Sequence, residues 1–431
     1  MAWFAESAGG APAARDGATE PESMRVVFIL ACVLGLGSAD QGTLGAVAAP
    51  LKQGLGIDNA DIGVLAAVVS AIGLLTTVPA GALTDRISRT RLLGVTIVLT
   101  SAAMIANGAA QSYGMILVSR LFLGAVSAAM APAVASLVGD YFPAEHRGRA
   151  YGFLLTGELL GTGFGYVIAG GVAAVFSWRW SFWVLVPIAL VLAFSVARLP
   201  EPRRGAQIDS AVEEEPKIPL RQALRYVLGV RSNLVLILVS SLLYFFLAAL
   251  RTFSSVFVQD QYSVGQAIGT MVLPLVGLGA VVGVLAGGRL SDGLMRAGHI
   301  RGRIVVGIIG YSLAVVLFLP AFASSVLLIA LPLFFLASAA LGLLNPPLDA
   351  ARLDVIHHRM WGRSEGVRTF GMLGATAAAP LTYGFLSESI GNEGAFLVIA
   401  GSLGLAAILL TAALRSYPSD MAAAEATSHG V

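Results

Sequence analysis

Charged residues and cysteine are both scarce in this chain. Asp, Glu, Lys and Arg together make up 12% of its 431 residues, and Cys32 is the one cysteine. Soluble domains carry roughly 25% charged residues, so a chain with half that share cannot cover a water-exposed surface. A single cysteine excludes an internal disulfide and any cysteine-based zinc cluster. The formal net charge of +2 gives no reason to expect a nucleic-acid partner.

Long apolar runs dominate instead. Hydrophobic residues reach 57% and the mean hydropathy is +0.82. About 20 apolar residues cross a bilayer core, and roughly twelve such runs can be counted. They lie at residues 25–49, 62–83, 92–110, 113–138, 151–176, 181–199, 233–257, 267–288, 304–321, 326–348, 366–386 and 394–414. The sequence therefore predicts an all-α membrane protein with twelve transmembrane helices.

The basic residues orient these helices. With the N-terminus in the cytoplasm, 23 of the 27 Lys and Arg residues fall in cytoplasmic segments, as the positive-inside rule requires. Both termini are therefore expected in the cytoplasm. Residues 1–24 lack the apolar core of a signal peptide and are expected to form a cytoplasmic tail. The remaining divisions are a six-helix bundle at 25–200, a cytoplasmic loop at 201–232, a second bundle at 233–415 and a tail at 416–431.

The two bundles carry an internal repeat. Gly81-Ala-Leu-Thr-Asp85 returns as Gly288-Arg-Leu-Ser-Asp292, which is 207 residues later. A second match at a distance of 214 residues aligns Asp140 with Asp354. Repeated halves of this kind are typical of secondary transporters, so the sequence predicts two pseudo-symmetric six-helix bundles.

One loop motif is specific to a known family. The segment Gly81-Ala-Leu-Thr-Asp85-Arg86-Ile-Ser-Arg89 resembles the G-x-L-x-D-R-x-G-R motif of the major facilitator superfamily, with Ser88 in place of a glycine. Arg120-x-x-x-Gly124 and the stretch from Asp140 to Arg149 fit the same superfamily. The resemblance covers about residues 25–415 and implies the major facilitator fold. It also implies alternating access between the two halves.

A cytoplasmic gate is expected around this motif. An acid at a helix end beside cations can form charge-assisted bonds that break in another conformational state. The alternative is that the cations only determine topology. The candidate gate residues are Asp85, Arg86, Arg89, Asp140, Arg147, Asp292, Asp349, Arg352, Glu365 and Arg368.

Ionisable residues deep inside a predicted span are candidates for function. Asp40 and Arg120 lie at similar depth on antiparallel helices, and helices in these positions line the central cavity of the superfamily. Asp40 is therefore the candidate proton site, with Arg120 as its counter-ion or as a contact for a substrate anion; a static pair that fixes packing is the alternative. Glu158, in a glycine-rich helix, is a second coupling candidate or a packing residue. This helix faintly resembles the antiporter motif of drug–proton exchangers but lacks its proline.

Four further residues are expected to line the substrate cavity. Arg251 is predicted near the outer end of its helix, as a gate residue or as an interfacial anchor. Asn345 precedes a pair of prolines that is expected to break or kink the helix, or only to let it bend. The helix around Asp40 resembles spinster-like lipid transporters, with two departures. Gln41 replaces an arginine of that family, and Ser127 stands where the family has a cavity glutamate.

These features predict a secondary active transporter and not an enzyme. No phosphate-binding loop for ATP is present, and the histidines lack carboxylates at metal-binding spacing, so neither cofactor nor metal is expected. The expected activity is proton-coupled export (antiport) of a hydrophobic or amphipathic molecule, lysolipid-like or drug-like. An uncoupled facilitator or a non-transporting sensor on the same scaffold is the alternative. The expected partners are this substrate, protons and the bilayer, and the chain is expected to act as a monomer. High Ala, Gly and Arg with almost no Lys point to a bacterial inner membrane.

Overall fold

The computed structural model describes residues 20–84, 86–142, 144–202, 219–357 and 360–429. The described part is helical and contains no strand. Its first nine helices are α1 (Glu20–Ala46), α2 (Ala48–Leu55), α3 (Asn59–Thr84), α4 (Arg89–Ala109), α5 (Tyr113–Ser127), α6 (Met130–Tyr141), α7 (Ala144–Val175), α8 (Trp178–Trp183) and α9 (Leu185–Ala197). The others are α10 (Leu220–Gly229), α11 (Arg231–Tyr262), α12 (Gln266–Gly269), α13 (Val272–Arg296), α14 (Gly302–Ala323), α15 (Leu327–Asp354) and α16 (Trp361–His429).

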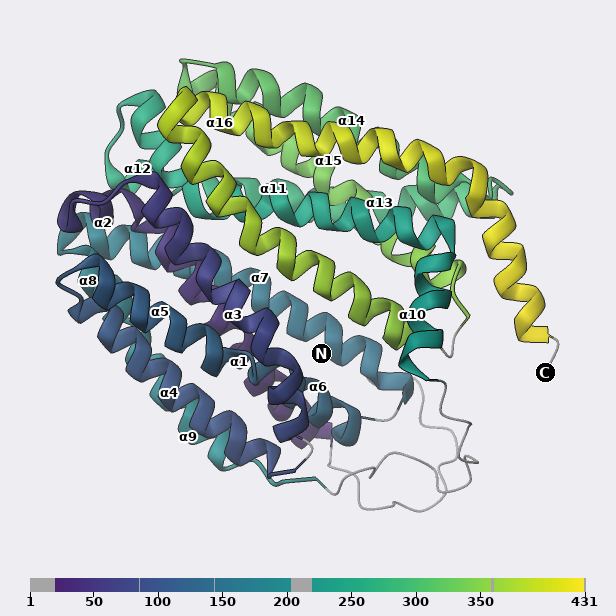
Figure 1. The fold of residues 1–431 in the computed structure, drawn as a ribbon, viewed down its shortest axis with the longest axis horizontal. Helices are drawn as coiled ribbons and strands as arrows, with labels where there is room; N and C mark the ends of the chain where they lie inside the picture. The colour runs from purple at the N-terminus through teal and green to yellow at the C-terminus, as the bar shows by residue number, and fades with distance from the viewer. Residues whose placement is uncertain (1–19, 85, 143, 203–218, 358–359, 430–431) are drawn as a thin grey trace.

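Eleven helical stretches in the described residues are long and apolar enough to cross a membrane. The last of them, in α16, is a helical hairpin, because the backbone at Gly391 has a φ of 76° and the helix turns back there (Figure 1). Glycine adopts positive φ without the steric penalty of a Cβ, so one residue replaces a loop. When the two arms of α16 are taken as separate membrane-spanning helices, the arrangement is consistent with the twelve that the sequence predicts.

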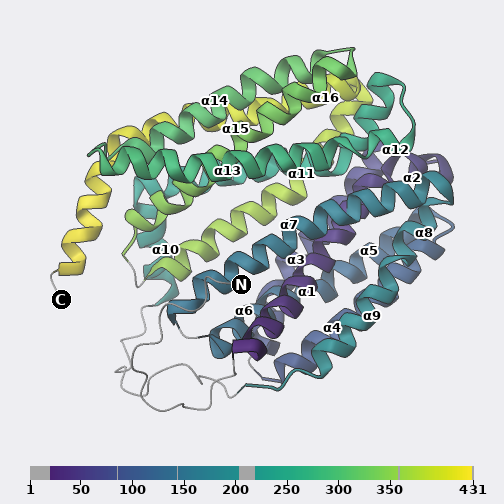
Figure 2. The same ribbon diagram turned by 180° about the vertical axis from the view of Figure 1, so that it is seen from behind.

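Helices α1 to α9 lie together in one part of the molecule and α11 to α16 in the other, as both views show (Figures 1 and 2). We call these groups the first and second halves. One apolar cluster lies entirely within residues 26–199 of the first half. The other joins both halves, because it contains Leu44 and Ile62 together with Phe253 and Phe257 of α11. The first-half members of this shared cluster lie toward the predicted outer end.

Glycines set the closest packing inside the first half. A Cβ on Gly157 would lie 2.5 Å from the carbonyl oxygen of Ala31, and one on Gly161 would lie 2.6 Å from the Cα of Gly35. Real Cβ atoms do not approach backbone atoms so closely, so α7 can pack on α1 only because these positions lack a side chain. Small residues in membrane helices favour such contacts. This packing holds α1, with Asp40, in a fixed place.

An ion pair recurs in both halves at the same spacing. Arg89, at the start of α4, binds Asp140 near the end of α6. Arg303, at the start of α14, binds Asp354 at the end of α15. Arg303 and Asp354 follow their first-half counterparts by 214 residues each, which is the distance of the sequence repeat. The repeat therefore extends to a side-chain contact.

The structure bears on two expectations about the helices. Helix α15 continues from Leu327 to Asp354 through Pro346 and Pro347, so the prolines do not break it, and a kink or a bend stays a prediction. Membrane helices tolerate proline because neighbouring groups can satisfy the freed carbonyls. Helix α11 extends to Tyr262, so Arg251 lies 11 residues, about 16 Å, inside it. Arg251 is therefore not at the outer end of its helix.

Candidate functional site

A buried ion pair lies at the centre of the first half. Arg120 of α5 donates from Nη1 to Oδ2 of Asp40 on α1, at 2.8 Å. Arg120 is 1% exposed and Asp40 is 3% exposed. The ring of Phe182 lies 5.2 Å from the Arg120 guanidinium carbon, a cation–π contact. The structure thus brings together the two residues that the sequence predicts to meet.

A small cavity of about 40 Å³ lies next to this pair, between the two halves. Arg120 lines it from the first half, with Gln41 and Ser70. Arg251 and Thr376 line it from the second half. Arg251 donates from Nη1 to Oε1 of Gln41 at 2.7 Å, which connects α11 with α1 across the halves. A polar wall that comes from both halves exists only while they are in contact.

Three other predicted site residues, the coupling candidate Glu158 and the cavity candidates Asn345 and Ser127, are not among the residues that line this cavity. Glu158 is partly exposed on α7 and interacts electrostatically with Arg251. Asn345 is partly buried on α15. Ser127 is also partly buried, and its hydroxyl lies 3.4 Å from the carbonyl oxygen of Gly124 in its own helix. Of the four predicted cavity residues, Gln41 and Arg251 line the cavity.

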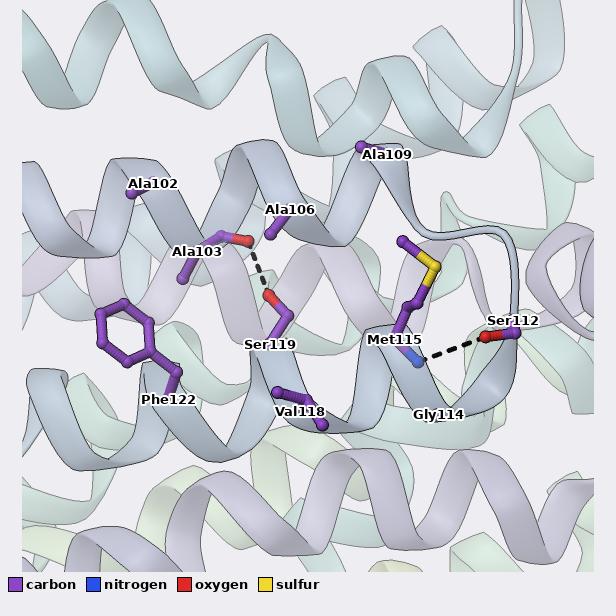
Figure 3. A pocket seen from close by; sticks show the side chains of 10 residues that line it. All are labelled: Ala102, Ala103, Ala106, Ala109, Ser112, Gly114, Met115, Val118, Ser119 and Phe122. Atoms are coloured by element: carbon purple, nitrogen blue, oxygen red, sulfur yellow. Dashed lines mark hydrogen bonds between the residues drawn. The ribbon is translucent and has the colours of Figure 1, made fainter.

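A larger hollow of about 890 Å³ lies on α4 and α5 (Figure 3). Its walls are small or apolar, with Ala102 and Ala106 on one helix facing Met115, Val118 and Phe122 on the other. The hydroxyl of Ser119 at its floor already donates to the carbonyl of Ala103 at 2.9 Å. Met115, Val118 and Phe122 are exposed, as expected for side chains that face lipid. This hollow offers no charged group to a ligand.

Side chains at the predicted outer end join the halves, and these contacts were not predicted from the sequence. Asn59, 5% exposed at the start of α3, is central. Its Nδ2 donates to Ser387 Oγ and to Asn392 Oδ1, each at 3.0 Å, and its backbone N–H donates to Glu388 at 3.0 Å. The surrounding residues Lys52 and Asp260 bind the two asparagines at 2.6 Å. We call this the outer polar cluster: Lys52, Asn59, Asp260, Ser387, Glu388 and Asn392.

Further contacts lie on the same side of the molecule. The Tyr166 hydroxyl is 2.9 Å from Ser254 Oγ, and the side-chain amide of Gln266 donates to the Ala46 carbonyl. A Cβ on Gly384 would lie 2.6 Å from the Asn59 carbonyl oxygen, so the helix backbones also touch. These hydrogen bonds, together with the Arg251–Gln41 bond at the cavity, join the halves between the cavity and the predicted outer end. The only sequence signal was polar residues at predicted helix ends, which are common.

Arg89 and Asp140, two of the predicted gate residues of the first half, are bound to each other within that half. The guanidinium of Arg89 is 1% exposed and binds both Asp140 and Glu201. Glu201 also accepts hydrogen bonds from the backbone and hydroxyl of Thr90 at 2.9 Å and 2.7 Å. Burial alone would raise the pKa of the Glu201 carboxyl, but these bonds outweigh it and lower the pKa to about 2. Glu201 was not predicted, because nothing in the loop sequence sets it apart from other acids.

Other predicted gate residues have different surroundings. Arg147 donates to the Phe142 and Gly139 carbonyls at 3.0 Å and 2.8 Å, which satisfies the end of α6. Arg86 and Asp292 are exposed. Asp85 lies outside the described residues.

The predicted charge network of the second half forms between α15 and α16. Arg352 donates to Asp349 at 2.9 Å and to Glu365 at 2.7 Å, and Arg368 also binds Glu365. The two arginines are largely buried, whereas the side chains of Asp349 and Glu365 are 61% and 45% exposed. The exposed carboxylates can therefore meet a cation from another part of the molecule.

The sequence profile of the Major Facilitator Superfamily matches residues 29–298, which is more than half of the chain. The chain belongs to this superfamily. A probable 4-methylmuconolactone transporter of Cupriavidus pinatubonensis is 31% identical over 143 residues, 32% of this chain and 33% of the relative. The quinolone resistance protein NorB of Staphylococcus aureus is 29% identical over 146 residues, 33% of this chain and 32% of that protein. The match thus spans about a third of the length of these relatives.

Solved structures of two other transporters have a similar fold. A bacterial homologue of the human lysosomal transporter Spinster, inward-facing and unoccupied, has a TM-score of 0.80 and 17% sequence identity. The alignment covers 94% of this chain and 99% of that one. The nucleoside transporter NupG has a TM-score of 0.70 and 12% identity, over 91% of this chain and 98% of its own. The chain is thus an integral membrane protein with the fold of this transporter superfamily.

Proposed function

We propose that this protein is a secondary active transporter that exports a hydrophobic or amphipathic small molecule by exchange for protons. The observation that carries the proposal is the Asp40–Arg120 pair, buried beside a cavity between the halves. Charges inside a membrane protein are costly and are kept mainly where they act. When Asp40 takes up a proton, Arg120 loses its partner, so the pair has two electrostatic states.

Alternating access would come from movement of residues 25–200 against residues 233–415. In this scheme the bonds of the outer polar cluster close the predicted outer side, and the present arrangement is taken as the state open toward the cytoplasm. In the opposite state these bonds would break, and the cytoplasmic candidates Asp85, Arg86 and the network around Glu365 would come together across the halves. A bacterial inner membrane, cytoplasmic termini and a monomer complete the proposal.

The substrate class follows from the lining. The cavity wall combines the apolar residues Leu44, Ala66 and Val69 with the polar side chains of Gln41 and Arg251, which suits one end of an amphipathic lysolipid-like or drug-like molecule. NorB, a relative by sequence, is named for quinolone resistance, which supports export of a drug-like molecule. Glu158 is a second proton site in this scheme, because it is partly exposed and lies within electrostatic range of Arg251.

Reconstitution into liposomes tests the proposal. We expect efflux of at least one member of a panel of amphipathic cations and lysolipids to depend on an imposed pH gradient. Asp40→Asn should abolish gradient-driven flux and leave exchange of labelled for unlabelled substrate measurable. Glu393→Gln, outside both the cavity and the outer polar cluster, is the matched control. Flux that ignores the gradient would favour the uncoupled facilitator, with Asp40 and Arg120 as a structural pair.

A further inference from the structure

The Arg120 guanidinium has hydrogen-bond donors to spare. Its Nη1 binds Asp40, but among the described residues its Nε and Nη2 are buried without a partner. Asp40 Oδ1 is also buried and has no hydrogen-bond partner among the described residues. A guanidinium carries five N–H donors, and a buried donor that lacks an acceptor is costly, more so when it is charged. A group with acceptor lone pairs in the neighbouring cavity would remove this cost.

A second cation lies on the cavity wall. Arg251 contributes its guanidinium from the other half, and its hydrogen-bond partner there, Gln41, is neutral. The cavity thus faces two cations, and in the described part of the chain Asp40 is the one carboxylate that forms an ion pair with either. Ser70, Thr252 and Thr376 add hydroxyl groups to the lining. The local charge and the available donors both favour an anion.

The size of the cavity limits what can enter. About 40 Å³ exceeds the roughly 10–15 Å³ that a single water molecule needs. It leaves room for one small ion or one small head group but not for an entire drug-like molecule. We infer that this cavity binds a single monovalent anionic group between Arg120 and Arg251, and that the anion binds together with a proton on Asp40. The proton part of this inference rests on the proposed function.

The sign of the coupling follows from competition for Arg120. The ionised Asp40 carboxylate neutralises Arg120 and repels a second anion, whereas protonated Asp40 does neither. Anion and proton therefore strengthen each other's binding, and by thermodynamic linkage the effect is equal in both directions. The other ionisable groups in this part of the bundle are Glu158 and Tyr166 on α7 and Tyr244 on α11, and none of them lines the cavity.

Two sources of the anionic group have different consequences. A free halide such as chloride would move with the proton, opposite to an exported substrate. The carboxylate of an organic acid would make the substrate itself travel with the proton, so that a proton gradient would drive its uptake. Both share the chemistry of one compact negative charge that accepts hydrogen bonds from guanidinium groups.

Equilibrium titration of the full-length protein in detergent, in a chloride-free and weakly buffered solution, tests the inference. The probes are chloride and benzoate. Wild-type protein should bind at least one of them more tightly as the pH falls, and should take up protons when that anion is added. Asp40→Asn should bind the anion more tightly than wild type, without proton uptake. Arg251→Gln should weaken binding about 10- to 100-fold, the range for one charge-assisted hydrogen bond.

Two further variants keep the test decisive. Arg120→Gln alone leaves a buried unpaired carboxylate and can fail to fold, so the double variant Asp40→Asn/Arg120→Gln is used and should not bind. Arg179→Gln is the control, since Arg179 binds the Ala110 carbonyl outside the cavity and its loss should change nothing. Binding of chloride alone identifies a free halide as the ligand, and binding of benzoate alone identifies the carboxylate of a substrate.

The inference is overturned if neither probe binds to wild type or to Asp40→Asn at any pH. It is also overturned if Arg251→Gln binds like wild type, or if Asp40→Asn still takes up protons with the anion. These titrations need no transported substrate. Anion binding can therefore be found where gradient-driven efflux is not, and efflux can be found where anion binding is not. The failure of one proposal is thus distinguishable from the failure of the other.

Discussion

Asn59→Ala is expected to open the predicted outer side of the protein. The substitution removes two side-chain hydrogen bonds that cross between the halves, to Ser387 and Asn392. It also removes the acceptor for Lys52, which lies in the same half. The backbone N–H that donates to Glu388 is retained, so the start of α3 keeps one of its cross-half contacts.

The magnitude follows from the number of bonds lost across the interface. A typical hydrogen bond contributes about 0.5–1.5 kcal/mol net, so two of them amount to about 1–3 kcal/mol. A bias of that size changes the ratio of two conformations by about 5- to 150-fold. An outward-open state that is rare in the wild type should therefore become readily detectable in the variant.

Distance measurement between two spin labels reads this out. Gln53 on α2 and Ser389 on α16 are exposed and lie in different halves. Replacing both by cysteine in a Cys32→Ser background gives a labelled pair, because Cys32 is the only native cysteine. Double electron–electron resonance should show a longer-distance population that grows in Asn59→Ala. Asp58→Ala is the control, since the Asp58 carboxylate accepts a hydrogen bond from the Asp61 backbone N–H at 2.8 Å, inside the first half. Identical distance distributions for Asn59→Ala and wild type would refute the reasoning.

Three other perturbations are expected to act on stability. Gly161→Ala should lower the melting temperature, because its Cβ would overlap the Gly35 backbone at a cost of about 1–3 kcal/mol. Gly163→Ala is the control, because its Cβ would have no atom within 4 Å and should leave the melting temperature unchanged. Equal changes in melting temperature for the two variants would contradict this account of the helix packing. In a Glu201→Gln background, which removes the second carboxylate from Arg89, Asp140→Asn should cost more than Asp354→Asn in thermal denaturation, because Arg89 is 1% exposed and Arg303 is 18% exposed. The reverse order would show that burial does not set the cost. Because folding lowers the pKa of Glu201 to about 2, its stabilising contribution is present above pH 4.5 and is lost as the pH falls toward 2. Glu201→Gln should remove that part of the acid dependence of unfolding, and an unchanged acid profile would exclude the contribution.

Features that depend on one helix at a time were predictable from the sequence. Apolar run length located the membrane spans, and basic residues between them gave the predicted orientation. The Asp40–Arg120 contact was also predictable, because each residue's depth can be counted along its own helix and the two helices run in opposite directions. The family resemblance supplied the remaining piece, that these helices are neighbours.

Features that depend on packing between distant segments were not predictable. In the sequence, Asn59 and Asn392 lie outside the predicted apolar runs and resemble other polar residues there. Their contact depends on the packing of α3 against α16, which a hydropathy pattern does not predict. Glu201 gains its role from the start of α4, more than one hundred residues earlier. The position of Arg251 was misjudged because the polar residues after Phe257 end the apolar run while the helix itself continues to Tyr262. Local composition therefore gives the end of a hydrophobic stretch, which is not the end of a helix.

The pairs Arg89–Asp140 and Arg303–Asp354 each connect helices of the same half. A rocking motion of one half against the other would leave both pairs intact and unstrained, since the two members of each pair move together. Each half is thus held together internally at its cytoplasmic end, where the protein is open in the proposed state. The energetic difference between conformations is then concentrated in a thin layer of contacts at the opposite end. Substitutions in that layer should tune the speed of the transport cycle without loosening the protein as a whole.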